Sequence, residues 1–387
     1  MFDIDSTRLH SPFRTGEHQQ WRAQLRRFVD REIAPFIEQW DEDGSLPADL
    51  WPKAAGIGLL ALGYPEPYGG IPGDIFHTIV AAEELARCGA GGLYASLMVH
   101  GIALPPLVHY GDDALKEAVI PPVLRGERNI SLAITEPGAG SDVANLQCRA
   151  APDGDAYVVR GEKTFITGGM RANWFTAAVR TGGEGFGGIS LLLIPADAPG
   201  VERRALSRKQ GWWCSDTASI FFDGVRVPRE NLIGEENAGF LPIVHNFNGE
   251  RLGIAASCVE YSRVCLQEAI EWAQQRRTFG KRLADHQVIR HKFAQMLQRI
   301  NATAAYLELC AAAEQRGELG VADVSLLKVQ ATEVMEFCAR EAMQVMGGAG
   351  YMRGSRTERI YREVRVNAIG GGSEEILRDL AARQMGI

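Results

Sequence analysis

The sequence predicts a multidomain α+β protein in which a β domain lies between two helical domains. The evidence is the order of patterns along the 387 residues. Helical apolar spacing fills residues 1–127, short strand-like runs fill 128–238, and long helical spacing returns over 239–387. We therefore expect an N-terminal all-α domain, a middle antiparallel β domain and a C-terminal four-helix bundle within these bounds. No helical pattern separates the strands, which argues against a Rossmann fold.

The N-terminal domain is predicted from the spacing of its large apolar residues. Trp21, Leu25, Phe28, Ile33 and Ile37 recur at three- and four-residue intervals, which is typical of an amphipathic helix over residues 21–40. Gly-rich or Pro-containing breaks separate the segments that follow. Further helices are expected at residues 75–88, 93–110 and 112–124.

The other two domains are predicted from a change of period near residue 128. Short apolar or alternating runs between Gly, Asp and Pro residues indicate strands. We expect them at residues 130–135, 156–159, 163–167, 174–179, 189–194 and 219–227. Helical periodicity then returns, and we expect C-terminal helices at residues 252–276, 287–315, 321–346 and 373–384.

Composition narrows the class of protein. Apolar residues make up 46% of the chain and charged residues 23%, with a net charge of −7 and no basic block, so we expect no nucleic-acid partner. The seven cysteines are dispersed without a CxxC pair, which indicates reduced thiols in a cytoplasmic protein. No uncharged apolar run is long enough for a bilayer, so we expect no membrane association. The eight histidines show no metal-ligand spacing, so we expect no metal.

One glycine-rich segment has the character of a ligand-binding loop. The sequence ITEPGAGSD at residues 134–142 follows a predicted strand, and its small residues let backbone N–H groups approach phosphate or flavin atoms. Taken alone, the segment is more often a turn between strands, because the third glycine of a dinucleotide fingerprint is missing. Three further segments of the chain favour the ligand-binding interpretation over the turn. The accompanying segments are KTFITGG at 163–169, RRTFGK at 276–281 and QVMGGAGY at 344–351.

In order and spacing these four segments resemble the signature segments of the acyl-CoA dehydrogenase family across essentially the whole chain. The segments GWWCSDTA at 211–218 and IGGGS at 369–373 resemble a bacterial branch that includes citronellyl-CoA dehydrogenases, related to the isovaleryl- and long-chain types. The resemblance implies an FAD-dependent oxidoreductase of fatty acid or branched acyl catabolism. It would remove the α-proton and a β-hydride of an acyl-CoA to give the trans-2-enoyl-CoA. Two electrons would then pass to an electron-transferring flavoprotein.

The resemblance also implies where the cofactor binds. Contacts within one chain are expected from Leu132, Ile134, Thr135, Gly140, Ser141, Phe165, Thr167, Ser373 and Glu375, and Ser141 would also meet the substrate. Contacts from a neighbouring subunit are expected from Arg276, Phe279, Gln287, Gln344 and Gly348. The active unit would therefore be at least a homodimer, and a homotetramer built as a dimer of dimers is the usual family form. Two positions depart from the family: Phe165 stands for a usual Trp and Gly168 for a usual Asn.

The catalytic base is expected at Glu250. In many family members the base is the Glu of a Tyr-Glu-Gly-Thr segment, which aligns here with residues 370–373, where Gly370 and Gly371 replace the Tyr and the Glu. In the isovaleryl-CoA and long-chain branches the Glu belongs to a Glu-Arg-Leu segment, which Glu250 and Arg251 match. An arbitrary Glu-Arg pair near a helix start is usually a surface charge pair. Because residues 370–373 carry no carboxylate at the alternative base position, the catalytic interpretation of Glu250 is favoured.

The glycine segment is expected to bind substrate without side chains. The Gly371 N–H would donate to the thioester oxygen, and Arg251, Gly370, Gly371 and Gly372 would line the substrate site. The missing side chains would leave room for a β-methyl branch, as in isovaleryl or citronellyl thioesters. Alternatives on the same fold are an acyl-CoA oxidase, an enoyl-CoA reductase and a non-catalytic flavin- or acyl-CoA-binding protein.

Overall fold

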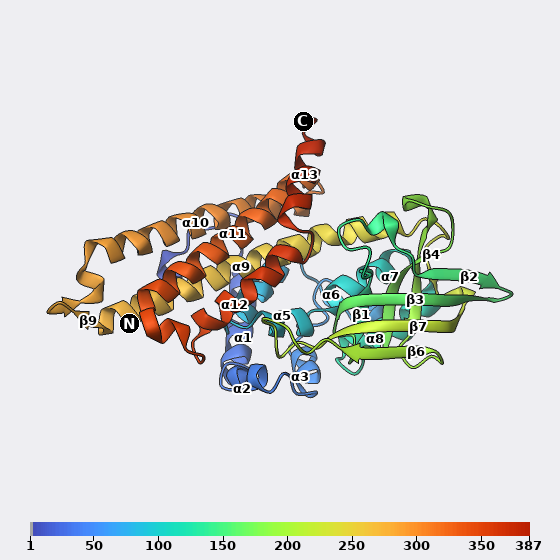
Figure 1. Ribbon diagram of the computed structural model, residues 1–387, viewed down its shortest axis with the longest axis horizontal. Coiled ribbons are helices and arrows are strands. Elements are labelled where there is room, and N and C mark those ends of the chain that lie inside the picture. The colour runs from blue at the N-terminus through green and yellow to red at the C-terminus, as the bar shows by residue number, and fades with distance from the viewer. Residues whose placement is uncertain (1–2) are drawn as a thin grey trace.

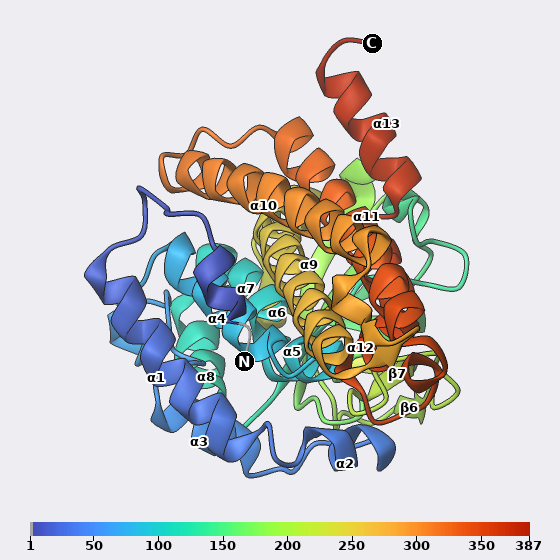
Figure 2. The same cartoon turned by 90° about the vertical axis from the view of Figure 1, so that its left-hand side faces the viewer.

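The protein has three parts in the predicted order, helical, β and helical, in a computed structural model that describes residues 3–387 (Figure 1). The sheet lies at one end of the molecule, and the long C-terminal helices extend away from it (Figure 1). Viewed along the bundle, α9 runs through the middle, with the N-terminal helices α1, α3 and α4 on one side and α10 and α11 on the other (Figure 2). The predicted fold class is therefore confirmed.

The N-terminal part contains short helices and confirms two of its predicted segments closely. Its helices are α1 (Gly16–Glu32), α2 (Ile37–Glu42), α3 (Leu50–Gly56), α4 (Ile75–Ala86), α5 (Gly91–Leu97), α6 (His100–Ala103), α7 (Pro105–Tyr110) and α8 (Asp113–Leu124). The single helix predicted over 21–40 is wrong, because Pro35 lacks an N–H and the chain turns between α1 and α2. The helix predicted over 93–110 is likewise split into α5, α6 and α7, the last of which starts at Pro105.

The middle part is one mixed, mostly antiparallel sheet. Its strands are β1 (Ile130–Ala133), β2 (Arg149–Asp153), β3 (Ala156–Thr167), β4 (Trp174–Arg180), β5 (Ile189–Pro195), β6 (Val201–Ala205), β7 (Thr217–Pro228) and β8 (Leu232–Ile233). The hydrogen-bonded order is β6-β7-β3-β2-β4-β5-β8, and β1 pairs with β4 in parallel. The two strands predicted at 156–159 and 163–167 are one long strand with irregularities after Val159 and Lys163. The second irregularity places Phe165 at φ +59°.

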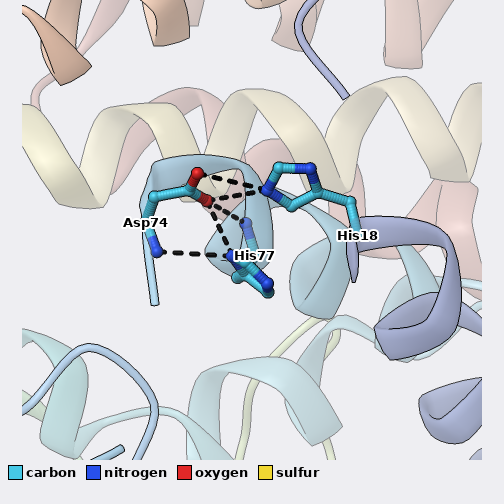
Figure 3. A group of neighbouring side chains, drawn as sticks. All are labelled: His18, Asp74 and His77. Carbon is cyan, nitrogen blue, oxygen red and sulfur yellow. Dashed lines mark hydrogen bonds and ion pairs between the residues drawn. The ribbon is translucent and has the colours of Figure 1, made fainter. Parts of the chain in front are cut away.

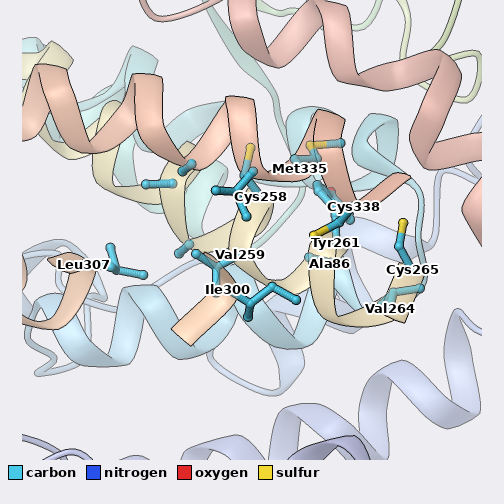
Figure 4. Packing of buried hydrophobic residues seen from close by; sticks show 14 of the residues in the cluster. Ala86, Cys258, Val259, Tyr261, Val264, Cys265, Ile300, Leu307, Met335 and Cys338 are labelled. Atoms are coloured by element: carbon cyan, nitrogen blue, oxygen red, sulfur yellow. The ribbon is translucent and has the colours of Figure 1, made fainter. Parts of the chain in front are cut away.

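The C-terminal part is a helical bundle with a small hairpin at its far end. It consists of α9 (Phe240–Gln275), the hairpin strands β9 (Arg277–Thr278) and β10 (Lys281–Arg282), α10 (Gln287–Gln315), α11 (Val321–Met346), α12 (Arg356–Ile369) and α13 (Glu374–Gln384). The apolar faces of α9, α10 and α11 form the core, where Cys258, Ile300 and Met335 are fully buried (Figure 4). The predicted bounds of α10 and α11 are confirmed, whereas α12 was not predicted.

No single helix in the described part of the chain is both long and apolar enough to cross a membrane. The helices α5 and α6–α7 meet the length and composition criteria only as a pair, with a bend of 50° between them. Leu93, Leu97, Leu104 and Leu107 of this pair are fully buried inside the protein. Their apolar character is therefore accounted for by the protein core.

Candidate active site

Glu250 lies on α9 and its carboxylate approaches the turn between α12 and α13, residues 370–372. A Cβ atom placed on Gly371 would lie 3.9 Å from both Cδ and Oε1 of Glu250. The same Cβ would lie 2.8 Å from Cδ1 of Ile254, and Gly371 has φ +68°, so this position favours glycine on two grounds. The structure thus brings the two expected catalytic positions together, although they are far apart in sequence.

The backbone of this turn presents one free donor. In the part of the chain that the structure describes, the N–H of Gly371 has no acceptor, whereas the preceding N–H, of Gly370, donates to Val366 O at 2.8 Å. The carbonyl of Gly371 accepts a hydrogen bond from Arg251 Nε at 3.2 Å. Proton abstraction next to a carbonyl requires a base and an oxyanion donor in one site, and Glu250 and the free N–H of Gly371 can supply them.

Glu250 is electrostatically suited to act as a base. Burial raises the pKa of Glu250 above its ordinary 4.5, although the positive charges of Arg251 and Lys328 oppose the shift. The residue keeps some exposure, so a ligand can reach it. General-base catalysis is most effective when the pKa of the base lies near the working pH, and the direction of this shift is the favourable one.

Arg251 was expected to contact substrate, and the structure gives it a different set of neighbours. It is 94% buried, donates to the Gly371 carbonyl and lies over the ring of Phe247 with 5.8 Å between the guanidinium carbon and the ring centroid. These contacts hold the turn. A direct contact between Arg251 and substrate stays a prediction.

Two residues that sequence reasoning missed complete the surroundings of Glu250. Tyr94 of α5 approaches α9 so closely that a Cβ on Gly253 would lie 2.5 Å from its hydroxyl oxygen. Burial raises the pKa of Tyr94, and the nearby charge of Glu250 raises it further. Lys328 of α11 is fully buried and donates to the backbone of the 370–372 turn. A lysine in the middle of an apolar helical stretch was the one sequence signal that could have identified it.

The ITEPGAGSD loop is held by a buried ion pair. Lys163 Nζ donates to Glu136 Oε1 at 2.7 Å and to Ile134 O at 3.0 Å, and both charged side chains are at least 93% buried. The Glu136 carboxylate also accepts the backbone N–H groups of Gln147 and Cys148. The segment after β1 is therefore fixed in place by its own charged residues.

Several expected cofactor positions gather around this loop. The hydroxyl groups of Thr135, Ser141 and Thr167 make no hydrogen bond with any other group in the described part of the chain. Phe165 is 69% exposed, and nothing lies within 4 Å of a Cβ placed on Gly140. Leu132 and Ile134 line the same segment from β1 and its end. Open backbone, free hydroxyls and an exposed aromatic ring are what a bound flavin would use, so these residues fit FAD.

The departure from the family at Gly168 has a visible effect. Gly168 has φ +71°, and a Cβ there would lie 3.0 Å from Ser131 Oγ. That hydroxyl is fully buried and has no hydrogen-bond partner within residues 3–387. The small residue at 168 therefore leaves a buried polar group beside the end of β3.

The remaining expected cofactor residues lie elsewhere in the chain. Arg276, Phe279 and Gln287 are exposed on the β9–β10 hairpin and the start of α10, at the opposite end of the molecule from the sheet (Figure 1). Gln344 and Gly348 are exposed at the end of α11. The structure does not bring these residues to the ITEPGAGSD loop within one chain.

Ser373 and Glu375 start α13, next to the 370–372 turn. The Ser373 side chain accepts the N–H of Ile376 at 3.5 Å and so caps the helix. Glu375 is exposed in the first turn of the same helix. A contact of Ser373 or Glu375 with the cofactor stays a prediction.

A cluster of possible metal ligands does form, despite the lack of a sequence spacing for it. Asp74 lies between His18 and His77, with oxygen–nitrogen distances of 3.0 and 2.8 Å (Figure 3). His18 Nδ1 accepts the backbone N–H of Thr15 at 2.8 Å, so the ring hydrogen belongs on Nε2, where it donates to Asp74. A metal would need that nitrogen free, and Asp74 already caps α4. The hydrogen bonding favours a helix-capping cluster.

The Trp212–Trp213 segment joins the three parts of the protein. The ring of Trp213 lies between the guanidinium groups of Arg353 and Arg362, at 4.6 and 3.7 Å. The buried Glu363 of α12 accepts the N–H groups of Trp212 and of Gly91, at the start of α5. Buried charge therefore holds this segment in addition to aromatic packing.

Comparison with known proteins agrees with this architecture. The family models for the N-terminal, middle and C-terminal domains of acyl-CoA dehydrogenases match residues 15–127, 131–225 and 237–386. The chain is 40% identical to acyl-CoA dehydrogenase AFT10-1 of Alternaria alternata, over 96% of this chain and 92% of that one. It is 34% identical to the mitochondrial long-chain specific acyl-CoA dehydrogenase of Rattus norvegicus, over 99% and 89%.

The solved structures include a similar protein. A probable acyl-CoA dehydrogenase from Mycobacterium abscessus superposes with a TM-score of 0.94 at 46% identity, covering 96% of this chain and 99% of the other. Sequence relatives, family models and fold therefore agree over nearly the whole length. The chain belongs to the acyl-CoA dehydrogenase family, whose members use FAD.

Proposed function

We propose that this protein dehydrogenates an acyl-CoA thioester between Cα and Cβ, with Glu250 as the base. The observation that supports it best is the approach of the Glu250 carboxylate to Gly371, whose N–H is free. Glu250 takes the α-proton, and the electron pair left on Cα spreads onto the thioester oxygen, where the N–H donates to it. Bound FAD supplies the acceptor for the β-hydride. The ITEPGAGSD loop, Phe165 and Thr167 would hold it.

Anaerobic mixing with acyl-CoA tests this proposal. The FAD-loaded protein should lose its visible flavin absorbance when a suitable acyl-CoA is added without oxygen. Glu250→Gln should keep its FAD and lose the bleaching rate by a factor of about 10²–10⁴, the range that general-base catalysis contributes. Bleaching of the variant at the wild-type rate would refute the assignment. Peroxide formation in air at the turnover rate would identify an oxidase instead of a dehydrogenase that passes electrons to an electron-transferring flavoprotein.

We propose a β-branched or isoprenoid acyl chain, such as a citronellyl-like one, as the preferred substrate. Its support is that Gly370 and Gly371 stand where many family members carry a Tyr and a Glu, in the segment expected to line the substrate site. The competing candidate is a straight long chain, which the name of the rat relative favours. A panel of acyl-CoAs scored by the rate of anaerobic bleaching separates them. Faster bleaching by straight long chains than by β-branched chains contradicts our choice.

We also propose that two copies of the chain share each FAD, in a homodimer or a dimer of such dimers. Phe279 supports this, because its side chain is 98% exposed at φ +49° on the tip of the β9–β10 hairpin. The ring meets the edge of His286, with 6.3 Å between ring centroids, and so large an exposed apolar surface gains from being covered. The other exposed residues at this end carry polar or backbone groups that suit a dinucleotide. A second copy would bring this end to the ITEPGAGSD loop of the first.

A further inference from the structure

Lys328 stands apart from the other charged residues of α11 because its ammonium group is fully buried. Its Nζ donates to Ala368 O and to Gly372 O, each at 2.9 Å. Ala368 is in the last turn of α12 and Gly372 immediately precedes the N-cap of α13. One side chain therefore ties both ends of the 370–372 turn to the neighbouring helix.

The same turn is held from its other side by Arg251. Its Nε donates to Gly371 O, so cations from α9 and α11 occupy two consecutive carbonyls of the turn. The N–H of Gly371 stays without an acceptor in the described part of the chain. With its carbonyls fixed, the turn has little freedom to reorient that N–H.

Lys328 has neighbours in common with the candidate active site, among them Glu250 and Arg251. Burial lowers the pKa of Lys328 to about 8, while the nearby Cys258, Glu374 and Glu250 raise it and Arg251 lowers it. At neutral pH the group is mostly charged. Burying an ammonium is costly unless it is paired and hydrogen-bonded, and a cation at the end of α12 gives only a modest helix-dipole stabilisation. The contacts of Lys328 leave it a different role, which is to fix the backbone of the turn beside Glu250.

We propose that Lys328 is a positioning residue, which holds the 370–372 turn so that the Gly371 N–H points at the thioester oxygen of the substrate. The inference rests on the proposed function, since it assigns the N–H to the negative charge of that reaction. A purely structural role would lower stability when Lys328 is replaced. It would not change how strongly the site stabilises an enolate.

The enolate of acetoacetyl-CoA is a direct probe of that stabilisation. The α-proton of this thioester leaves without any hydride transfer, and the enolate is followed by its ultraviolet absorbance. In the FAD-loaded protein, we expect Lys328→Met to raise the pH midpoint of enolate formation by one to two units, a 10- to 100-fold loss. Lys328→Gln keeps an amide donor at reduced reach and should fall between wild type and Lys328→Met.

Thr332→Val is the matched control. Thr332 is buried one turn further along α11 and donates only to carbonyls of its own helix, those of Lys328 and Val329. The Thr332→Val variant should be less stable than wild type and keep the wild-type pH midpoint of enolate formation. A wild-type midpoint in both Lys328 variants would overturn the inference. A wild-type protein that no acyl-CoA bleaches would refute the proposed function, which separates the two failures.

Discussion

Gly371→Ala perturbs the proposed oxyanion donor with the smallest possible side chain. At φ +68° a residue with a Cβ costs about 1–2 kcal/mol of folding free energy relative to glycine. The new Cβ would lie 2.8 Å from Ile254 Cδ1, the end of a flexible side chain that can move. We therefore expect stability to fall by about 1–2 kcal/mol while the fold persists. The turn should relax away from the strained φ, and the N–H shifts with it.

The rate of flavin reduction should respond much more than stability. Removing one oxyanion donor lowers rates by about 10²–10³, so a misdirected donor should cost about 10- to 100-fold. The assay is stopped-flow bleaching by acyl-CoA without oxygen, alongside thermal unfolding. Gly317→Ala is the control, because Gly317 has φ +70° with nothing within 4 Å of its Cβ position, between α10 and α11. If both variants lose stability and bleach at the wild-type rate, the donor role of Gly371 is refuted.

Three further predictions concern the partner copy and the buried carboxylates. Phe279→Asp should weaken self-association, measured by sedimentation, and FAD retention, measured by flavin absorbance, at least tenfold each. The control is Phe36→Asp, which changes a 49% exposed ring of the N-terminal part and should leave both unchanged. Unchanged self-association of Phe279→Asp would contradict the shared site. Burial raises the pKa of Glu363 from 4.5 to about 7, so between these pH values the native state binds a proton that the unfolded state does not. Stability should therefore fall as pH rises from 4.5 to about 7. Unfolding measured as a function of pH should show a flatter slope for Glu363→Gln. The pKa of Glu250 is also raised by burial, so its charged form destabilises the native state at higher pH. At pH 7, Glu250→Gln should therefore unfold at a higher temperature than wild type. A lower unfolding temperature would argue against a destabilising buried charge at this position.

Much of the fold could be predicted from the sequence because apolar spacing dominates its long elements. The limits of α10 and α11 match the predicted ones at both ends. The unpredicted α12 has buried Arg359 and Glu363 where a spacing argument expects apolar residues. The unpredicted β2 and β6 are mostly exposed, so little apolar alternation marks them. Charged residues that pair inside the protein hide the period on which such predictions depend.

The site was less predictable, because its geometry joins distant segments. Glu250 and Gly371 were found through the family pattern, and their contact through space became visible only in the structure. Tyr94 and Lys328 reach the same place from α5 and α11, and no local motif marks either of them. The His18–Asp74–His77 cluster shows the same limit, since two of its residues are 56 positions apart. Sequence spacing identifies ligands on one element and misses those that packing brings together.

Hydrogen exchange at the substrate α-carbon tests most directly whether Glu250 is the base. With the flavin reduced beforehand, no hydride can leave, and acyl-CoA in heavy water reports proton abstraction alone. The account predicts that the wild-type protein incorporates deuterium at Cα and that Glu250→Gln does so about 10²–10⁴ times more slowly, with FAD still bound. Deuterium incorporation by Glu250→Gln at the wild-type rate would contradict it.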